Sequence, residues 1–144
     1  DRIRRDDKAQ LDHAVELLRA HLTRLPTTNP MTRFHSRLES DIEWLQSNGI
    51  DGFHSYAFGT CRQCGASAEL AASFVEWLAE REPDGPGDLP KAAAAYHSIA
   101  ERCKGLEFGL ARLARGRKVD LEDTFAQLAS DWQDATTILT ARYA

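Results

Sequence analysis

Two cysteines in the middle of the chain have the spacing of half a zinc site or of a redox pair. Cys61 and Cys64 are separated by two residues, and Cys103 is the third cysteine of the chain. A structural zinc site takes about four ligands, so Cys103 and a histidine such as His54 or His97 would have to complete the set. Cysteine is also among the residue types most often buried in a core. Because no second Cys-x-x-Cys pair is present, we interpret these cysteines as core residues and expect no metal.

A cysteine nucleophile activated by histidine is a second possibility for the same segment. His54 precedes Cys61 by seven residues, which is two helical turns or roughly 10 Å along the axis. That separation is too long for a direct hydrogen bond between the imidazole and the thiol. His97 would have to approach from another helix, and the sequence does not fix its position. The segment therefore identifies no catalytic residue, and whether the chain is itself an enzyme stays open.

A stripe of polar residues suggests a different chemistry, the binding of a charged ligand. Ser55, Arg62, Glu69 and Glu76 recur every seven residues in a mostly apolar segment, and such positions share one helix face with a drift of about 20°. In one interpretation this face is simply exposed to solvent. In the other, Arg62 and Glu69 line a pocket between helices. Arg62 would then bind a carboxylate or a phosphate, and Glu69 would orient Arg62 or bind an amine.

A second polar face contains His97, Glu101, Lys104 and Phe108, at helical spacing. A charged helix face is usually exposed to solvent, so this pattern alone is weak evidence for a site. The chain contains no His-Glu-x-x-His motif, no Glu-x-x-His pair and no glycine-rich phosphate loop. The metalloprotease, di-iron and nucleotide-binding classes therefore lack their signatures.

The elements that must position these residues are helices. Apolar residues recur at three- and four-residue steps, and strict alternation never persists long enough for a strand. The expected helices cover about residues 3–25, 30–48, 51–82 and 89–115, and the last one begins at residue 121. Apolar residues cover most directions around the helix over 51–82, so we expect it to be central and largely buried. The predicted fold is an all-α bundle of about five antiparallel helices.

The ends of these helices have recognisable signals. Asn29 can cap the second helix with Pro30 at its first position, where no amide hydrogen is needed. Asp88 and Asp120 are the expected caps of the last two helices. The predicted breaks are Asn48-Gly49, the Pro- and Gly-rich segment 83–87, and Gly116.

The composition limits the domain organisation and the partners. A chain of 144 residues with 42% hydrophobic residues fits a single helical domain over 1–144. The 18 Lys and Arg residues against 22 Asp and Glu give a net charge of −4, so we expect neither nucleic acid nor a membrane as partner. A homo-oligomer stays possible. The few, odd-numbered cysteines favour the cytoplasm. Because the first residue is Asp1, we expect part of a longer polypeptide or a processed chain.

The segment around the polar stripe resembles the bacterial family known as domain of unknown function 1839. The similarity is tightest in FHSYAFGTCRQCGA, residues 53–66, and continues through ELAA at 69–72 to Trp77-Leu78. Further similar positions are Asn29-Pro30, Arg33-Phe34, the region 99–108, Trp132 and Arg142-Tyr143. The resemblance covers most of the chain. It implies that the chain corresponds to the C-terminal helical part of proteins about twice its length.

The resemblance also implies a function, because the family is associated in genomes with ligases that load amino acids onto phosphopantetheine carrier proteins. We therefore expect a helical domain that forms a substrate pocket or docks the carrier in carrier-dependent aminoacyl or acyl transfer. Any nucleophile would lie outside this helical part, and no cofactor is expected. The predicted ligand-binding residues are Arg62, Gln63 and Glu69, with His54, Tyr56 and Lys104 as neighbours.

Two other interpretations stay open. The chain could be a non-catalytic helical interaction module, which predicts an exposed polar stripe and no enclosed cavity at Arg62. A weaker alternative is a zinc or redox protein that uses the three cysteines. Burial separates the first two interpretations, because a buried pair of Arg62 and Glu69 would need hydrogen-bond partners to offset the lost hydration.

Overall fold

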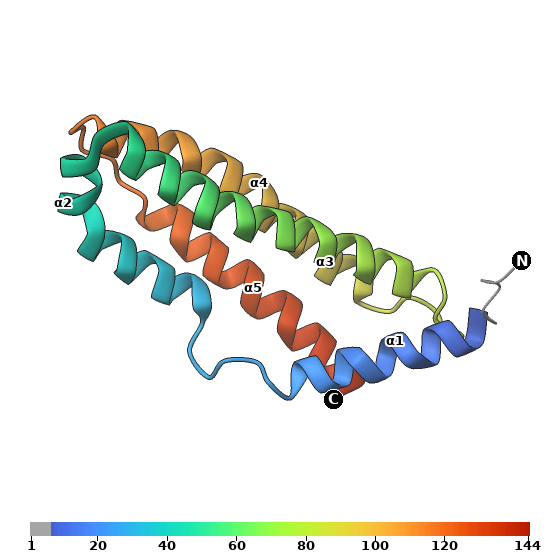
Figure 1. Cartoon of the computed structure of the whole chain (residues 1–144). Helices are drawn as coiled ribbons and strands as arrows, with labels where there is room; N and C mark the ends of the chain where they lie inside the picture. Colours follow the sequence, from blue (N-terminus) through green and yellow to red (C-terminus); the bar gives the residue numbers. More distant parts are fainter. Residues whose placement is uncertain (1–6) are drawn as a thin grey trace, which may run out of the picture.

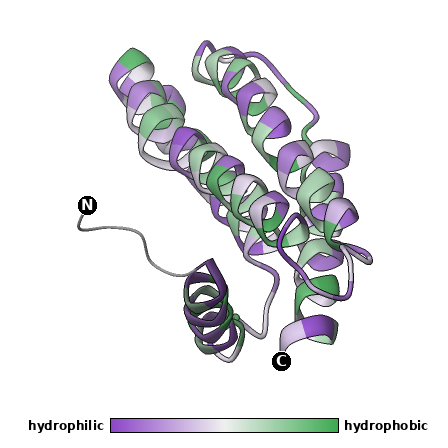
Figure 2. Cartoon of the chain, turned by 90° about the vertical axis from the view of Figure 1, so that its right-hand side faces the viewer, coloured by the Kyte–Doolittle hydropathy of each residue, from purple (hydrophilic) through white to green (hydrophobic). Residues whose placement is uncertain are grey.

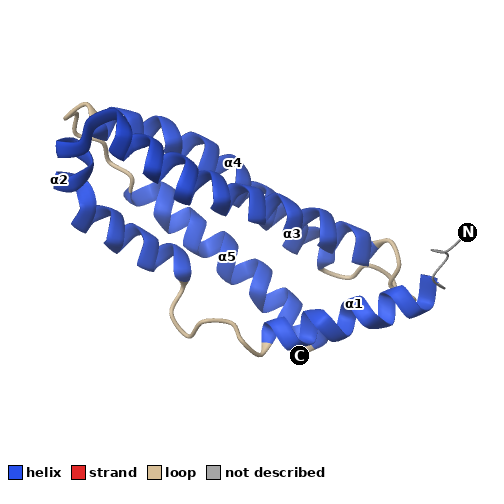
Figure 3. Cartoon of the chain, in the orientation of Figure 1, coloured by secondary structure: helices blue, strands red, loops and turns tan. Residues whose placement is uncertain are grey.

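The computed structural model describes residues 7–144, and these residues form helices joined by short connections (Figure 3). The elements in chain order are α1 (Asp7–Leu22), α2 (Pro30–Tyr56), the π-helical segment η1 (Ala57–Arg62), α3 (Gln63–Ala79), α4 (Leu89–Ala114) and α5 (Glu122–Tyr143). No strand occurs within the described range. The predicted all-α class is therefore confirmed. The predicted start of the first helix near residue 3 lies outside the described residues.

The start of α2 follows the sequence signal. The Asn29 side-chain oxygen accepts a hydrogen bond from the backbone N–H of Met31 at 3.0 Å, and Pro30 occupies the first turn. This arrangement satisfies one of the free N–H groups at a helix start. The Asn29 side-chain amide also donates to the carbonyl of Ala129 in α5 at 2.8 Å. One residue thus caps α2 and ties it to α5.

The break predicted at Asn48-Gly49 is present as a sharp corner. Gly49 has φ 52° and ψ −129° in an otherwise helical run, a conformation that side chains with a Cβ rarely adopt. Beyond this corner the chain reverses and continues helically through η1 into α3 (Figure 1). The helix predicted over 51–82 corresponds to this stretch, which ends at Ala79.

The two aspartate caps act differently from each other. Asp88 makes no side-chain cap bond and instead pairs with Lys91 at 2.8 Å between carboxylate and ammonium. The Asp120 carboxylate accepts from the backbone N–H of Glu122 at 3.0 Å, as a capping side chain would. Asp88 thus occupies the predicted N-cap position of α4, but its carboxylate pairs with Lys91 and does not bond to a backbone N–H of the first turn.

The central position belongs to α4, so the prediction of a central, largely buried third helix is wrong. Ten residues of α4 are buried, against seven in the longer stretch 51–82 that the third helix was expected to cover, and α4 contacts α2, η1, α3 and α5. Small residues allow this close packing: a Cβ at Gly109 would lie 2.9 Å from Leu121. Leu70 of α3 is instead 73% exposed. Apolar residues around the whole of a helix do not reveal which face a neighbour covers.

The core consists of two clusters, one toward each end of the bundle. The first joins α2, η1, α3, α4 and α5, and the second joins α1, α3, α4 and α5. Tyr96 packs against both. Helices α2 to α5 make the bundle, while α1, drawn beside them in Figure 2, packs on it through the second cluster and contacts α5. The Arg19 side chain fixes this contact by donating to the carbonyl of Tyr143 at 2.9 Å.

Within residues 7–144, none of the helices combines the length and the apolar character that crossing a bilayer requires.

Candidate functional site

The predicted polar stripe is exposed to solvent at Ser55, Arg62, Glu69 and Glu76. The expected pair of Arg62 and Glu69 does not form. The Arg62 guanidinium lies 4.6 Å from the centre of the Phe58 ring, a cation–π contact. No carboxylate of the described residues forms an ion pair with Arg62. Arg62 is therefore a cation that remains available to an external anion.

Three of the predicted site residues do come together at a cleft between α3 and α4. The cleft has a volume of about 530 Å³, and Arg62, Glu69 and Lys104 lie around it. Cys61, Ala100 and Cys103 are the buried members of its lining. These three charged residues lie at its solvent edge, since Arg62, Glu69 and Lys104 are all exposed, whereas Glu107, the fourth charged residue of the lining, is half-buried. The cleft is thus a surface feature and not an enclosed pocket around an ion pair.

The other three predicted residues lie outside this cleft. The Tyr56 hydroxyl donates to the Asp41 carboxylate at 2.6 Å, and burial together with this bond raises the pKa of Tyr56 above its ordinary range. His54 is exposed, with its ring 5.7 Å from that of Phe58. Gln63 is exposed at the start of α3. These residues lie near the junction of α2, η1 and α3, outside the cleft lining, so the six candidates do not form a single site.

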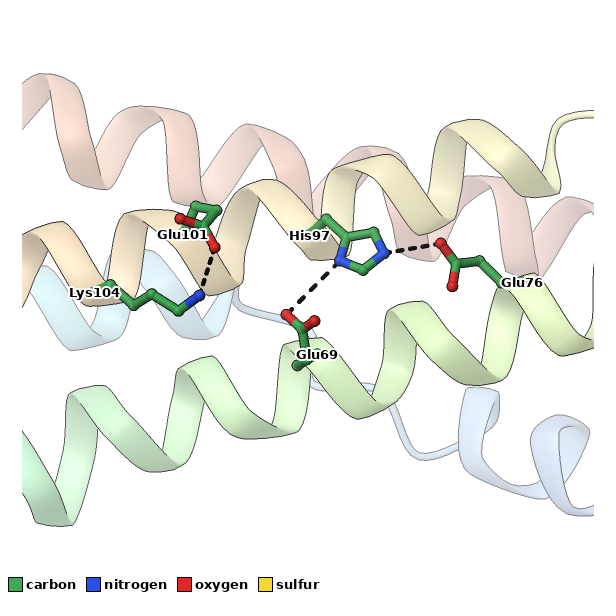
Figure 4. A network of polar contacts seen from close by, with 5 residues as sticks. All are labelled: Glu69, Glu76, His97, Glu101 and Lys104. Carbon is green, nitrogen blue, oxygen red and sulfur yellow. Dashed lines mark hydrogen bonds and ion pairs between the residues drawn. The ribbon is translucent and has the colours of Figure 1, made fainter.

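A polar network joins α3 and α4 along the same face (Figure 4). The His97 ring contacts Glu76 through Nε2 at 2.9 Å and Glu69 through Nδ1 at 3.7 Å. The hydrogen bond with Glu76 raises the pKa of His97 above its ordinary value. Lys104 donates to Glu101 at 2.5 Å. These charged groups satisfy one another, so the network is an exposed link between two helices.

The three cysteines are free thiols that lie near one another. Cys61 and Cys103 are buried, as expected for core residues, and burial raises the pKa of the Cys61 thiol to about 12. A hydrogen bond with Cys103 lowers the pKa of Cys64, and the same contact raises that of Cys103. No group of three or more His, Cys, Asp or Glu side chains in residues 7–144 has an arrangement that could hold a metal ion.

A second cavity between the helices was not predicted from the sequence patterns. A pocket of about 540 Å³ lies between α1, α3, α4 and α5, with further walls from Leu25 and Met31. Its surface is mostly apolar, with Leu18 on α1, Phe74 on α3 and Trp132 on α5 as large contributors. Sites for small molecules are typically apolar clefts of roughly 300–1,000 Å³ with a few polar groups. The pocket has the size and lining of such a site.

A few polar side chains interrupt the apolar lining. Ser67 and Tyr96 lie on α3 and α4, and His21 lies on α1. The Thr136 hydroxyl is already occupied, because it donates to the carbonyl of Trp132 at 2.8 Å. The signal that could have revealed this pocket is an excess of apolar residues on α3, more than the contact with α4 can cover.

The pocket and the charged cleft lie on opposite sides of α3. Ser67 and Ala71 line the pocket, whereas Ala66 and Glu69 line the cleft. Successive residues of an α-helix are about 100° apart, so these two sets face away from each other. A ligand in the pocket is therefore separated from the charged groups by the helix itself.

Comparison with known proteins identifies the family. The model of the DUF1839 C-terminal domain matches residues 7–141, which include the segment 53–66. Among curated proteins and among solved structures, no significant match to the chain is found. The family match covers almost all of the chain, in agreement with the resemblance in the sequence. The chain therefore belongs to the DUF1839 C-terminal domain family.

Proposed function

We propose that this domain holds the apolar part of a small-molecule substrate in the pocket between α1 and α3. In this proposal it is the substrate-pocket domain of a carrier-protein-dependent acyl or aminoacyl transfer protein. One observation supports the binding part: the pocket of about 540 Å³ with a mostly apolar surface. The transfer part rests on the family resemblance and is supported by the suitability of such a pocket for an acyl chain.

The lining explains why an acyl chain would bind. Each methylene group moved from water to an apolar environment contributes about 0.8 kcal/mol, and side chains from four helices surround this space. Leu17 of α1 lines the pocket and is 58% exposed. A bound chain would cover this side chain. Binding would thus bury apolar surface of both the ligand and the protein.

A titration with an acyl thioester tests the proposal. The probe is the N-acetylcysteamine thioester of octanoic acid, a small analogue of a carrier-bound acyl group, followed by calorimetry. Ala71→Trp places an indole in the pocket, and Ala66→Trp places the same group on the opposite face of α3. We expect Ala71→Trp to weaken binding at least tenfold, about 1.4 kcal/mol, and Ala66→Trp to bind as the wild type does.

The melting temperature of both variants shows whether they remain folded. Undiminished binding by a folded Ala71→Trp variant would contradict the proposal, because the thioester would then bind elsewhere. Absence of binding to the wild-type chain would contradict it as well.

A second candidate function is that of a helical interaction module, and the exposed stripe favours it. Arg62 is an exposed cation without a carboxylate partner in the described part of the chain. It could bind the phosphate of a phosphopantetheine carrier protein that docks on the face of α3 and α4. Pull-down with loaded and unloaded carrier tests this. Arg62→Gln should reduce capture severalfold, and Arg117→Gln, in an exposed connection, should not. Equal capture by both variants would contradict docking at Arg62.

A further inference from the structure

We infer that the pocket selects uncharged acyl derivatives, such as an amide, an ester or a thioester, and that the Tyr96 hydroxyl donates a hydrogen bond to their carbonyl oxygen. The inference rests on the proposed function and adds the chemical class of the ligand's head group. Free carboxylates and free amines with the same chain are excluded from the pocket.

The lining of the pocket offers no fixed charge to a ligand. Among the described residues that line the pocket, none is Asp, Glu, Lys or Arg. His21 is the histidine of this set, and it is exposed on α1. Arg62 and Glu69 lie on the opposite side of α3. A carboxylate or an ammonium group inside the pocket would lose its hydration without gaining a partner of opposite charge, which costs several kcal/mol.

The hydroxyl group of Tyr96 has no hydrogen-bond partner among the described residues. Tyr96 lines the pocket and packs against both core clusters, so it lies where the two clusters meet. Within residues 7–144, no fully buried side-chain nitrogen or oxygen lacks a partner. The Tyr96 hydroxyl is therefore not fully enclosed by protein, and it belongs to a side chain that lines the pocket.

The chemistry of this hydroxyl fits a neutral acceptor. Burial raises the pKa of Tyr96, so the phenol stays protonated and can donate. Ser67 adds a second hydroxyl to the lining, on α3. The carbonyl oxygen of an amide, ester or thioester accepts such a bond without bringing a charge into the pocket. Of the two substrate classes in the proposed function, this favours an acyl group over an aminoacyl group with a protonated amine.

Three probes with one chain length test the inference. Octanamide, octanoate and octylammonium differ only in the head group, and their affinities for the wild-type chain are measured by calorimetry at neutral pH. We expect octanamide to bind at least about tenfold more tightly than either ion. Tyr96→Phe should weaken octanamide binding roughly fivefold, the effect of one hydrogen bond. Tyr56→Phe, whose hydroxyl contacts Asp41 outside the pocket, should leave it unchanged.

The possible outcomes separate this inference from the proposed function. Equal affinity for octanoate and octanamide would overturn the inference while leaving an apolar binding pocket in place. Undiminished octanamide binding by Tyr96→Phe would overturn the role of Tyr96. If neither octanamide nor the octanoyl thioester binds, the proposed function falls together with the inference.

Discussion

The two sides of α3 have cavities of similar volume, about 540 Å³ toward α1 and about 530 Å³ toward α4. Their linings differ in charge. The cleft toward α4 has Arg62, Glu69, Lys104 and Glu107 in its lining. The described lining of the pocket toward α1 contains no Asp, Glu, Lys or Arg, and its Tyr96 hydroxyl has no hydrogen-bond partner among the described residues. The pocket is therefore suited to an apolar, uncharged ligand and the cleft to a charged one.

The largest expected effect is on the free energy of unfolding when a side chain is removed from the pocket wall and not from the charged cleft. Ile99 lines the pocket and is 1% exposed, so Ile99→Ala should lower the free energy of unfolding by about 2–5 kcal/mol. Glu69→Ala on the charged side should change it by less than about 0.5 kcal/mol. Urea denaturation measures both values. Similar losses for the two variants would show that the charged face is as important to the fold as the pocket wall.

A smaller effect should be confined to the helix that closes the pocket. Arg19→Ala removes the hydrogen bond to the carbonyl of Tyr143 and should weaken the docking of α1 by about 1 kcal/mol. Hydrogen exchange of the α1 amides should then accelerate, while that of the α4 amides stays the same. The control is Arg24→Ala, because Arg24 bonds only within its own segment, to the carbonyl of Ala20. If hydrogen exchange accelerates equally in both variants, the loss of a positive charge, and not of the bond to Tyr143, causes the effect.

The smallest expected effect is on the charged side and depends on pH. Glu76→Gln should lower the pKa of His97, measured by NMR titration of the imidazole, because the hydrogen bond with Glu76 is the largest cause of the raised value. Glu101→Gln should leave it unchanged, since Glu101 bonds to Lys104. A pKa of His97 that stays raised in Glu76→Gln would assign the shift to another group.

The sign of the pH dependence follows from that shift. Since the folded state binds the His97 proton more tightly than the unfolded state does, the stabilisation is complete below the ordinary pKa of 6.5. It is lost as the pH rises through the raised value. The contribution is small because the ring is exposed to solvent.

The local structure was predictable because its causes are local. Asn29 followed by Pro30 specifies a helix start, and the structure has the predicted capping bond. Gly49 adopts the positive φ that allows the chain to turn at the predicted break. Neighbouring residues determine both features, so the spacing of residue types was sufficient. The all-α class follows from the same periodicity.

The burial of whole helices and the location of the pocket were not predictable in this way. Leu70 and Ile99 are both apolar residues in helical patterns, yet one is 73% exposed and the other 1%. Which side chain is covered depends on how α3 and α4 are placed against each other and on where α1 lies. The heptad spacing did bring Arg62 and Glu69 to one cleft. Their partners could not be inferred, because the contact of Glu69 with His97 requires the register of α3 on α4.

The π-helical segment Ala57–Arg62 has a consequence for the evolution of the family. A π turn contains one residue more than an α turn needs, which corresponds to about 100° of rotation. A homologue with a single deletion in this segment would form an uninterrupted α-helix. Tyr56 would then be rotated relative to α3 and would lose the geometry of its bond to Asp41. An alignment gap in this segment would therefore mark a subfamily in which the residues before it are turned differently relative to α3, even where the flanking sequences are nearly identical.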